Sequence, residues 1–189
     1  MRTIKGRDFS WMNPPKQWSE EEGKFSLVTN AETDFWRKTH YGFIKNSGHF
    51  LHTDQAGDFE FMVQFSGNYT DLYDQAGLMI LLDNENWIKA GIEYVDGVQN
   101  AGAVVTRDCS DWSVVALNGS PSTFFIKAKR GRDYVEISYS LDGKNFQLLR
   151  QAYFPPAPLL RIGFMAASPK GKGFDIVFND FKINEYSQE

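Results

Sequence analysis

The sequence predicts an all-β fold: a sandwich of two antiparallel sheets with little or no helix. Aromatic residues make up 15% of the chain, and Phe and Gly each occur 16 times, a composition typical of strands and turns. No window of eleven or more residues places apolar side chains at the i, i+3, i+4, i+7 spacing of a helix. Short alternating segments separated by turn residues recur instead, about a dozen of them, which favours a sandwich.

The N-terminal third contains the clearest strand signal. Residues 8–18 predict an irregular, aromatic-rich entry because Pro14 and Pro15 disfavour both helix and central strand. Residues 24–29 and 48–53 favour short strands, and residues 33–43 are dense in aromatic and charged side chains. In residues 58–66 every second side chain is Phe or Val. That period of two predicts a strand with one buried face and one solvated face.

Residues 73–94 (YDQAGLMILLDNENWIKAGIEY) predict a central hairpin, because the cluster of turn-forming residues 83–86 separates two apolar runs. Ile88 and Ile92 alternate with Trp87, Lys89 and Glu93 in the second strand. Successive strand side chains point to opposite faces, so one face is apolar and the other carries an indole, an ammonium and a carboxylate. We expect this polar face to bind a ligand.

The remaining strands follow turn signals at Asp96-Gly97, residues 130–133 and Asp142-Gly143. They are predicted at residues 101–106, 112–117, 123–129, 134–140, 146–153, 160–167 and 174–183. Composition does not change along the chain, and no repeat or linker occurs. We therefore expect a single domain over residues 1–189.

Charge and cysteine content exclude several classes of protein. The net charge of −4 argues against nonspecific nucleic-acid binding, which requires a basic surface. No run of eighteen apolar residues or signal-peptide h-region occurs, so neither a membrane partner nor secretion is expected. The single cysteine, Cys109, cannot form an internal disulfide, which fits a reducing cytoplasm. The oligomeric state does not follow from the sequence.

Seven segments resemble a family of uncharacterised proteins named after a yeast "regulation of enolase" protein. They are WMNPP, TDFWRKTHYGF, YDQAGLMI, WIKAGIEYVDG, SDWS, YSLDGKNF and AASPKGKGF, in order from Trp11 to Ile183. The family belongs to the concanavalin A-like lectin/glucanase superfamily. The resemblance implies a concanavalin A-like jelly-roll sandwich whose ligand sits on the concave sheet, and it implies no particular reaction.

A carbohydrate or polyhydroxy ligand is the function we expect for this face. Sugars are recognised by a flat aromatic ring against the pyranose and by planar polar groups for the hydroxyls. Trp36 and Trp87 are the predicted stacking residues. The full candidate ligand-binding set is Asp34, Trp36, Arg37, His40, Asp74, Gln75, Trp87, Lys89, Glu93, Asp111 and Trp112. Burial of these Trp residues in the core, with the charges paired among themselves, is the simpler alternative.

A glycan-active enzyme on the same face is the main rival. Hydrolysis of a glycoside requires two carboxylates about 5–9.5 Å apart. Glu93 is the candidate catalytic residue, as base or nucleophile, because Lys89 two residues away favours its ionised form. Asp34, Asp74 and Asp111 are possible cross-strand partners. A protein-binding regulator of carbohydrate metabolism is the third alternative, suggested only by the name of the resembling family.

No metal and no cofactor are predicted. His49 and His52 are three residues apart in an extended segment and so face opposite ways. His40 could act as a base or ligand, and residues 83–86, or Asp108 with Asp111, could imitate a calcium site. Turn formation explains the cluster at 83–86 equally well. Residues 168–173 (SPKGKG) carry the glycines and cations of a phosphate cradle, but no helix follows, which favours a mobile loop.

Overall fold

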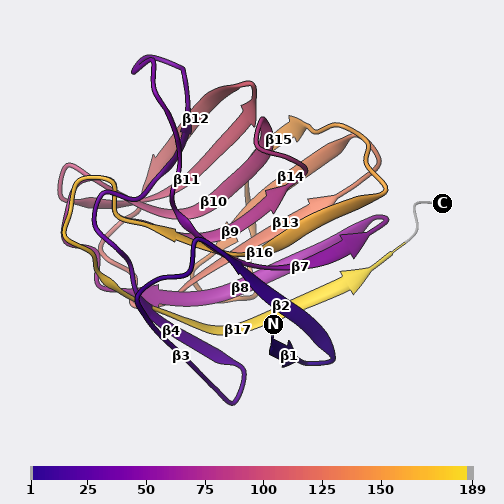
Figure 1. Cartoon of the computed structure of the whole chain (residues 1–189), viewed down its shortest axis with the longest axis horizontal. Coiled ribbons are helices and arrows are strands. Elements are labelled where there is room, and N and C mark those ends of the chain that lie inside the picture. Colours follow the sequence, from indigo (N-terminus) through magenta and orange to yellow (C-terminus); the bar gives the residue numbers. More distant parts are fainter. Residues whose placement is uncertain (1, 187–189) are drawn as a thin grey trace.

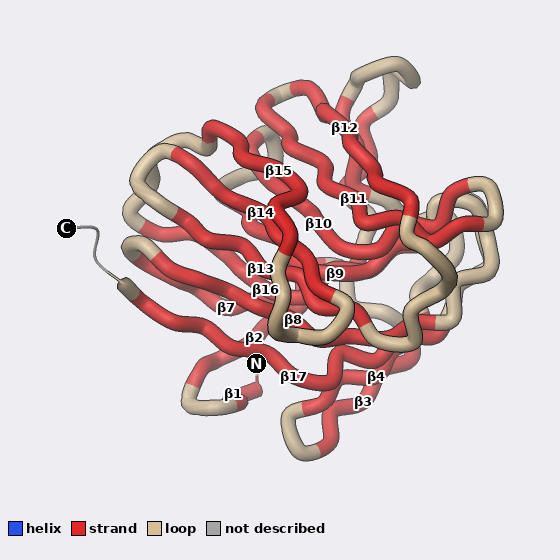
Figure 2. Tube along the Cα trace, turned by 180° about the vertical axis from the view of Figure 1, so that it is seen from behind, coloured by secondary structure: helices blue, strands red, loops and turns tan. Residues whose placement is uncertain are grey.

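The computed structural model describes residues 2–186 and confirms the all-β prediction. Strands joined by loops make up this part of the chain, and no helix occurs in it (Figure 2). It therefore contains no helix that could span a membrane. Two antiparallel sheets form the layers of a sandwich (Figure 1).

The first sheet has eight strands, and all of its pairings are antiparallel. Its order is β1 (Arg2–Ile4), β2 (Arg7–Met12), β7 (His49–Ala56), β16 (Leu159–Ala167), β9 (Gln75–Leu81), β10 (Asn86–Val95), β11 (Val98–Arg107) and β12 (Cys109–Ala116). The predicted central hairpin is the β9–β10 pair, in which Glu93 lies opposite Gln75 and Lys89 opposite Met79.

The second sheet has seven strands, also antiparallel. Its order is β15 (Gln147–Tyr153), β14 (Tyr134–Ser140), β13 (Phe124–Arg130), β8 (Phe59–Gly67), β17 (Asp175–Glu185), β4 (Lys24–Val28) and β3 (Gln17–Glu21). A separate short hairpin consists of β5 (Phe35–Arg37) and β6 (Ile44–Asn46).

The main core lies between the two sheets and follows the predicted alternation. The side chains on one face of β8, Phe59, Phe61, Val63 and Phe65, are fully buried there. They belong to the same hydrophobic cluster as Ile88 and Ile92 of β10. Phe164 of β16 packs against Phe178 of β17 with ring centroids 5.0 Å apart. This core holds the sheets together and leaves the outer face of the eight-stranded sheet for other contacts.

The prediction for residues 8–18 was wrong in part. This segment is not irregular, because it enters β2 and ends in β3, one strand in each sheet. Pro14 and Pro15 lie in the connection between the strands, where no ladder hydrogen bond is lost. The two prolines therefore mark the crossover from one sheet to the other, and β3 is the edge strand on the far side of that crossover.

Candidate functional site

A pocket with a volume of about 230 Å³ opens on the outer face of the eight-stranded sheet. We call it the outer-face pocket. Its lining comes from β9, β10 and β12, from the β5–β6 hairpin, and from the loops before β9 and after β16. The lining residues are Asp34, Trp36, Tyr41, Phe43, Lys45, Leu72, Tyr73, Gln75, Lys89, Glu93, Trp112, Pro169 and Lys170. Six of the predicted ligand-binding residues are among them.

The β5–β6 hairpin covers the part of the outer face next to this pocket. Phe35 is 2% exposed, and its ring packs edge-on against Trp87, with centroids 6.1 Å apart. The two rings belong to a second apolar cluster that also contains Met79 and Met165. Gly48 permits this packing, because a Cβ atom there would lie 2.4 Å from the Phe35 ring. The part of the outer face under the β5–β6 hairpin is thus buried, and the pocket begins at the edge of the hairpin.

Lys89 connects the hairpin to the sheet at the boundary of the pocket. Its ammonium group donates to the carbonyl of Phe35 at 2.7 Å and to Asp34 Oδ1 at 3.4 Å. Gln75 Nε2 also donates to Asp34 Oδ1, at 3.5 Å, and to the carbonyl of Tyr73 at 3.2 Å. Lys89 is only 4% exposed. A buried ammonium requires such partners, since an unpaired charge is costly away from water.

A row of three glycines separates Lys89 from Glu93 on the pocket floor. Gly91 lies opposite Gly77 on one side and Gly102 on the other. A Cβ atom at Gly91 would lie 2.0 Å from the carbonyl oxygen of Ala76, so no larger residue fits between these strands. The row leaves a shallow hollow in the sheet surface between the ammonium and the carboxylate.

Glu93 and Trp112 form the polar contact at the open side of the pocket. The indole Nε1 of Trp112 donates to Glu93 Oε2 at 2.7 Å. Burial raises the pKa of Glu93 above its usual value of 4.5, against the lowering effects of the Lys89 charge and the Trp112 hydrogen bond. The net shift is thus opposite to the lowering expected from Lys89. The ammonium of Lys89 contacts Asp34 and a carbonyl instead, so desolvation of the carboxyl dominates.

Aromatic side chains form the rim of the pocket. Tyr41 stacks on Phe43 with centroids 5.3 Å apart, and Trp36 meets Tyr41 edge-on at 5.7 Å. Across the opening, Tyr73 meets Trp112 edge-on at 6.3 Å. Tyr41, Phe43 and Trp112 are between 38% and 48% exposed. These faces are available to a ligand with an apolar surface.

The phenol of Tyr73 is held in an unusual position at the rim. Its backbone has a φ of 69°, a left-handed value that costs a bulky residue about 1–3 kcal/mol. Two hydrogen bonds hold it there: its N–H donates to the Tyr94 carbonyl at 2.7 Å, and its own carbonyl accepts from Gln75. A hydrogen bond to Tyr41, with partial burial, raises the pKa of Tyr73 to about 12. The phenol therefore remains neutral at physiological pH and is available for hydrogen bonding.

Trp87 does not have the predicted stacking role. It projects from the outer face, as the alternation in β10 predicted, but it is only 3% exposed because the β5–β6 hairpin covers it. Its indole packs against Phe35 and the methionines of the second cluster. An indole in this position stabilises the hairpin and presents no ring face to a ligand.

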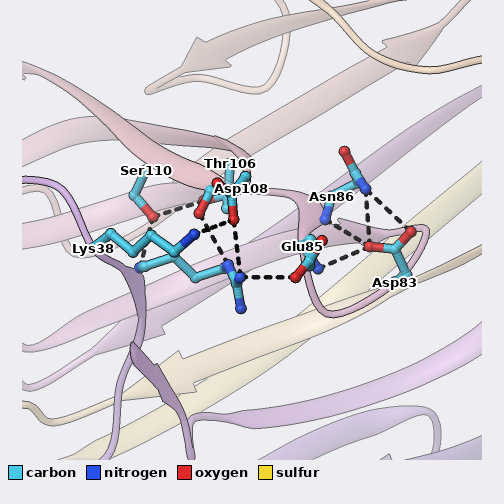
Figure 3. A network of polar contacts seen from close by, with 8 residues as sticks. Lys38, Asp83, Glu85, Asn86, Thr106, Asp108 and Ser110 are labelled. Atoms are coloured by element: carbon cyan, nitrogen blue, oxygen red, sulfur yellow. Dashed lines mark hydrogen bonds and ion pairs between the residues drawn. The ribbon is translucent and has the colours of Figure 1, made fainter. Parts of the chain in front are cut away.

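Arg37 belongs to an ion-pair network outside the pocket. Its guanidinium group donates to Glu85 Oε1 at 3.0 Å and to the carbonyl of Asp108 at 3.0 Å. Lys38 donates to the carboxylate of Asp108 at 2.5 Å, beside Ser110 and the turn at Asp83 (Figure 3). These cations lower the pKa of Asp108. Arg37 thus positions the hairpin that carries Trp36, and, unlike the predicted residues listed above, it does not line the pocket.

The turn at residues 83–86 uses its own carboxylate internally. Asp83 Oδ1 accepts from the backbone N–H groups of Glu85 and Asn86, each at 2.8 Å. Turn formation therefore accounts for this cluster. Among residues 2–186, no group of three or more His, Cys, Asp or Glu side chains is arranged to hold a metal ion.

Three further predicted residues lie away from the pocket. Asp74 is fully buried; its carboxylate accepts from the backbone N–H groups of Thr70 and Asp71 and from Ser168 Oγ. It therefore orders two loops of the pocket wall without lining it. Asp111 alternates with Trp112 along β12 and so faces the other side of the sheet. His40 is exposed in the hairpin loop, with its ring against Tyr41.

Seven lining residues are not among those predicted from the sequence: Tyr41, Phe43, Lys45, Leu72, Tyr73, Pro169 and Lys170. Two available signals pointed to some of them. Tyr41 and Phe43 belong to the same dense aromatic segment as Trp36, and Lys170 belongs to the segment with the glycines and cations of a phosphate cradle. Neither signal says that the two segments meet at one pocket.

Comparison with known proteins finds a matching family and similar structures. The model described as "Protein of unknown function (DUF1349)" matches residues 11–186. "Regulation of enolase protein 1" of Saccharomyces cerevisiae is 38% identical over 174 residues, which cover 92% of this chain and 88% of that protein. The crystal structure of a functionally unknown protein from Saccharomyces cerevisiae has a TM-score of 0.92 at 37% identity, covering 95% of this chain and 97% of that one.

More distant structures share the fold alone. The GH43 protein BlXynB from Bacillus licheniformis has a TM-score of 0.76 at 17% identity, over 95% of this chain but only 37% of that one. A legume lectin-like domain from Entamoeba histolytica has a TM-score of 0.61 at 11% identity, over 95% of this chain and 90% of that one. These likenesses show that the fold is a concanavalin A-like sandwich, as the resemblance implied.

The different positions of Trp87 and Trp112 lead to a prediction about stability. Trp87→Ala should lower the free energy of unfolding by about 3–5 kcal/mol, because it empties the centre of the second cluster. Trp112→Ala should cost about 1 kcal/mol, because it removes mainly one partly exposed hydrogen bond. Denaturant unfolding of both variants measures the difference. Equal losses would contradict the assignment of Trp87 to packing.

The raised pKa of Glu93 predicts how stability depends on pH. A carboxyl whose pKa is raised by folding stabilises the protein fully below its unfolded pKa, and that contribution is lost as pH rises through the folded pKa. Glu93→Gln removes this dependence. Its free energy of unfolding, measured from about pH 4 to about pH 8, should therefore increase relative to that of the wild type as pH rises. A difference that is constant, or that decreases, would contradict the burial of this carboxyl.

Proposed function

The chain belongs to the DUF1349 family of proteins of unknown function, and we propose that it binds a carbohydrate or related polyhydroxy compound in the outer-face pocket. The observation that carries this proposal is the arrangement of the lining. Exposed aromatic rings surround a floor that presents carboxylate, amide and ammonium groups. A pyranose has the complementary surface, with an apolar face for the rings and hydroxyls for the polar groups.

The polar groups of the floor are held in place before any ligand binds. Asp34 accepts from Lys89, from Gln75 and from the backbone N–H of Phe35, the last at 2.8 Å. Glu93 is oriented by Trp112. Side chains that are already ordered lose little conformational entropy on binding. This favours recognition of a small ligand whose own contact area is limited.

The size of the pocket favours one sugar ring over a long chain. Its volume of about 230 Å³ lies below the roughly 300–1,000 Å³ of pockets that take drug-sized ligands. The hairpin, the loop of residues 69–73 and β12 provide walls on different sides. A free monosaccharide, or the end residue of a glycan, matches this shape.

Binding is tested by titrating the purified chain with a panel of monosaccharides and following affinity by calorimetry or NMR. We expect saturable binding that Trp112→Ala weakens about tenfold or more, through loss of the ring and of the Glu93 hydrogen bond. Tyr153→Ala is the matched control, because Tyr153 is also an exposed aromatic, at 51%, but lies on β15 outside the pocket. Absence of binding across the panel, or equal weakening by both variants, would refute the proposal.

A second candidate, a glycan-active enzyme, is favoured by two features of the pocket. The raised pKa of Glu93 suits a proton donor, and Asp34 lines the same pocket as a second carboxylate. Incubation with oligosaccharides should then release new reducing ends, and Glu93→Gln should abolish that release while leaving affinity largely intact. Saturable binding without any product would leave the binding function and remove the enzyme.

A further inference from the structure

Two lysines at the outer-face pocket have no carboxylate partner in the part of the chain that the structure describes. Lys45 comes from β6 and Lys170 from the loop after β16, and both line the pocket. Within residues 2–186, neither ammonium group lies within ion-pair distance of an acidic side chain. The ammonium of Lys45 lies over the ring of Phe43, 5.5 Å from its centroid. These two charges are therefore available to a ligand.

The other charges of the pocket are already satisfied. The carboxylate of Asp34 contacts Lys89 and accepts two further hydrogen bonds, and burial disfavours the negative charge on Glu93. In total, the pocket lining contains three ammonium groups and two carboxyl groups. The pocket is cationic in a chain whose net charge is −4. A local field of this sign attracts anions selectively to the pocket.

The loop that carries Lys170 is anchored on both sides of this residue. Ser168 is fully buried; its Oγ donates to Asp74 at 2.6 Å, and its N–H donates to Thr33 Oγ1 at 3.0 Å. Gly171 packs so closely against Asp71 that a Cβ atom would lie 2.4 Å from its carboxylate. The loop expected from the sequence to be mobile is thus tied to the pocket wall, and Lys170 is held at its edge.

From these observations we propose that the ligand is a monosaccharide carrying an anionic substituent, a phosphate monoester or a carboxylate, that contacts Lys45 and Lys170. This inference rests on the proposed carbohydrate site and names its ligand class. The sugar ring occupies the polar floor and the aromatic rim, and the anionic group lies at the mouth between the hairpin and the loop after β16. Ammonium groups bind such anions through charge-assisted hydrogen bonds.

The test compares neutral monosaccharides with their 6-phosphates, the matching uronic acids and inorganic phosphate, all against the full chain. We expect the phosphate or the uronate of a sugar to bind at least about tenfold more tightly than its neutral parent. This advantage should decrease as ionic strength rises from about 10 mM to about 150 mM, over which the Debye length falls from about 30 to about 8 Å. Comparing the two anionic series identifies the substituent.

Matched lysine substitutions connect the effect to these two residues. Lys45→Gln and Lys170→Gln should each reduce the ratio of anionic to neutral affinity, and the double variant should bring the ratio close to one. Lys144→Gln is the control, because it removes the same charge from an exposed residue in the β14–β15 turn, outside the pocket. The ratio should be unchanged in this variant.

The outcomes separate this inference from the proposed function. Equal affinity for neutral and anionic sugars, or a ratio unaffected by both pocket lysines, would overturn the anionic ligand and leave the carbohydrate site standing. Failure of every sugar to bind would overturn both. Inorganic phosphate that binds as tightly as a sugar phosphate would show an anion site that does not recognise the sugar, and would overturn this inference. The binding of the neutral sugars would then decide whether the carbohydrate site stands.

Discussion

The outer face of the eight-stranded sheet depends on the buried ammonium group of Lys89. This group is bound by the Phe35 carbonyl and by Asp34, so it fixes the β5–β6 hairpin at one height above the sheet. Removing either the ammonium or the carboxylate would leave the other charge buried without a partner, which costs free energy of folding. The position of the hairpin then decides which outer side chains become core and which line a pocket.

The hairpin divides the outer face into a dry part and an open part. On the dry part, Phe35 and Trp87 belong to a second apolar cluster. Arg37 secures the hairpin to Glu85 in the β9–β10 turn and to Asp108 between β11 and β12. On the open part, the glycine row lowers the floor between Lys89 and Glu93. Charged side chains thus serve two purposes here: some hold the hairpin, and others remain available for a ligand.

The sequence predicts well which side chains share one face of a strand. It predicts poorly which other segment of the chain packs over that face. Alternation in β8 and β10 identifies which side chains share a face, because this periodicity is a local property of a strand. It does not say whether a segment distant in the chain lies on top. The pattern alone therefore predicts a ligand-stacking role for Trp87, which the β5–β6 hairpin covers. The placement of Arg37 and Asp74 in the ligand site was not predicted correctly for the same reason. Arg37 contacts Asp108 and Asp74 contacts Ser168, and both partners are distant in the sequence. Tyr73 and Lys170 reach the pocket through backbone and loop contacts that no local pattern encodes.

Hydrogen–deuterium exchange in a Lys89→Met variant tests most directly whether this ammonium group holds the hairpin that forms the pocket. The account predicts that backbone amides of β5 and β6 exchange at least about tenfold faster than in the wild type, whereas those of β8 in the main core retain their protection. Unchanged exchange in β5 and β6 would contradict it, because the hairpin would then be held over the sheet without the Lys89 contacts.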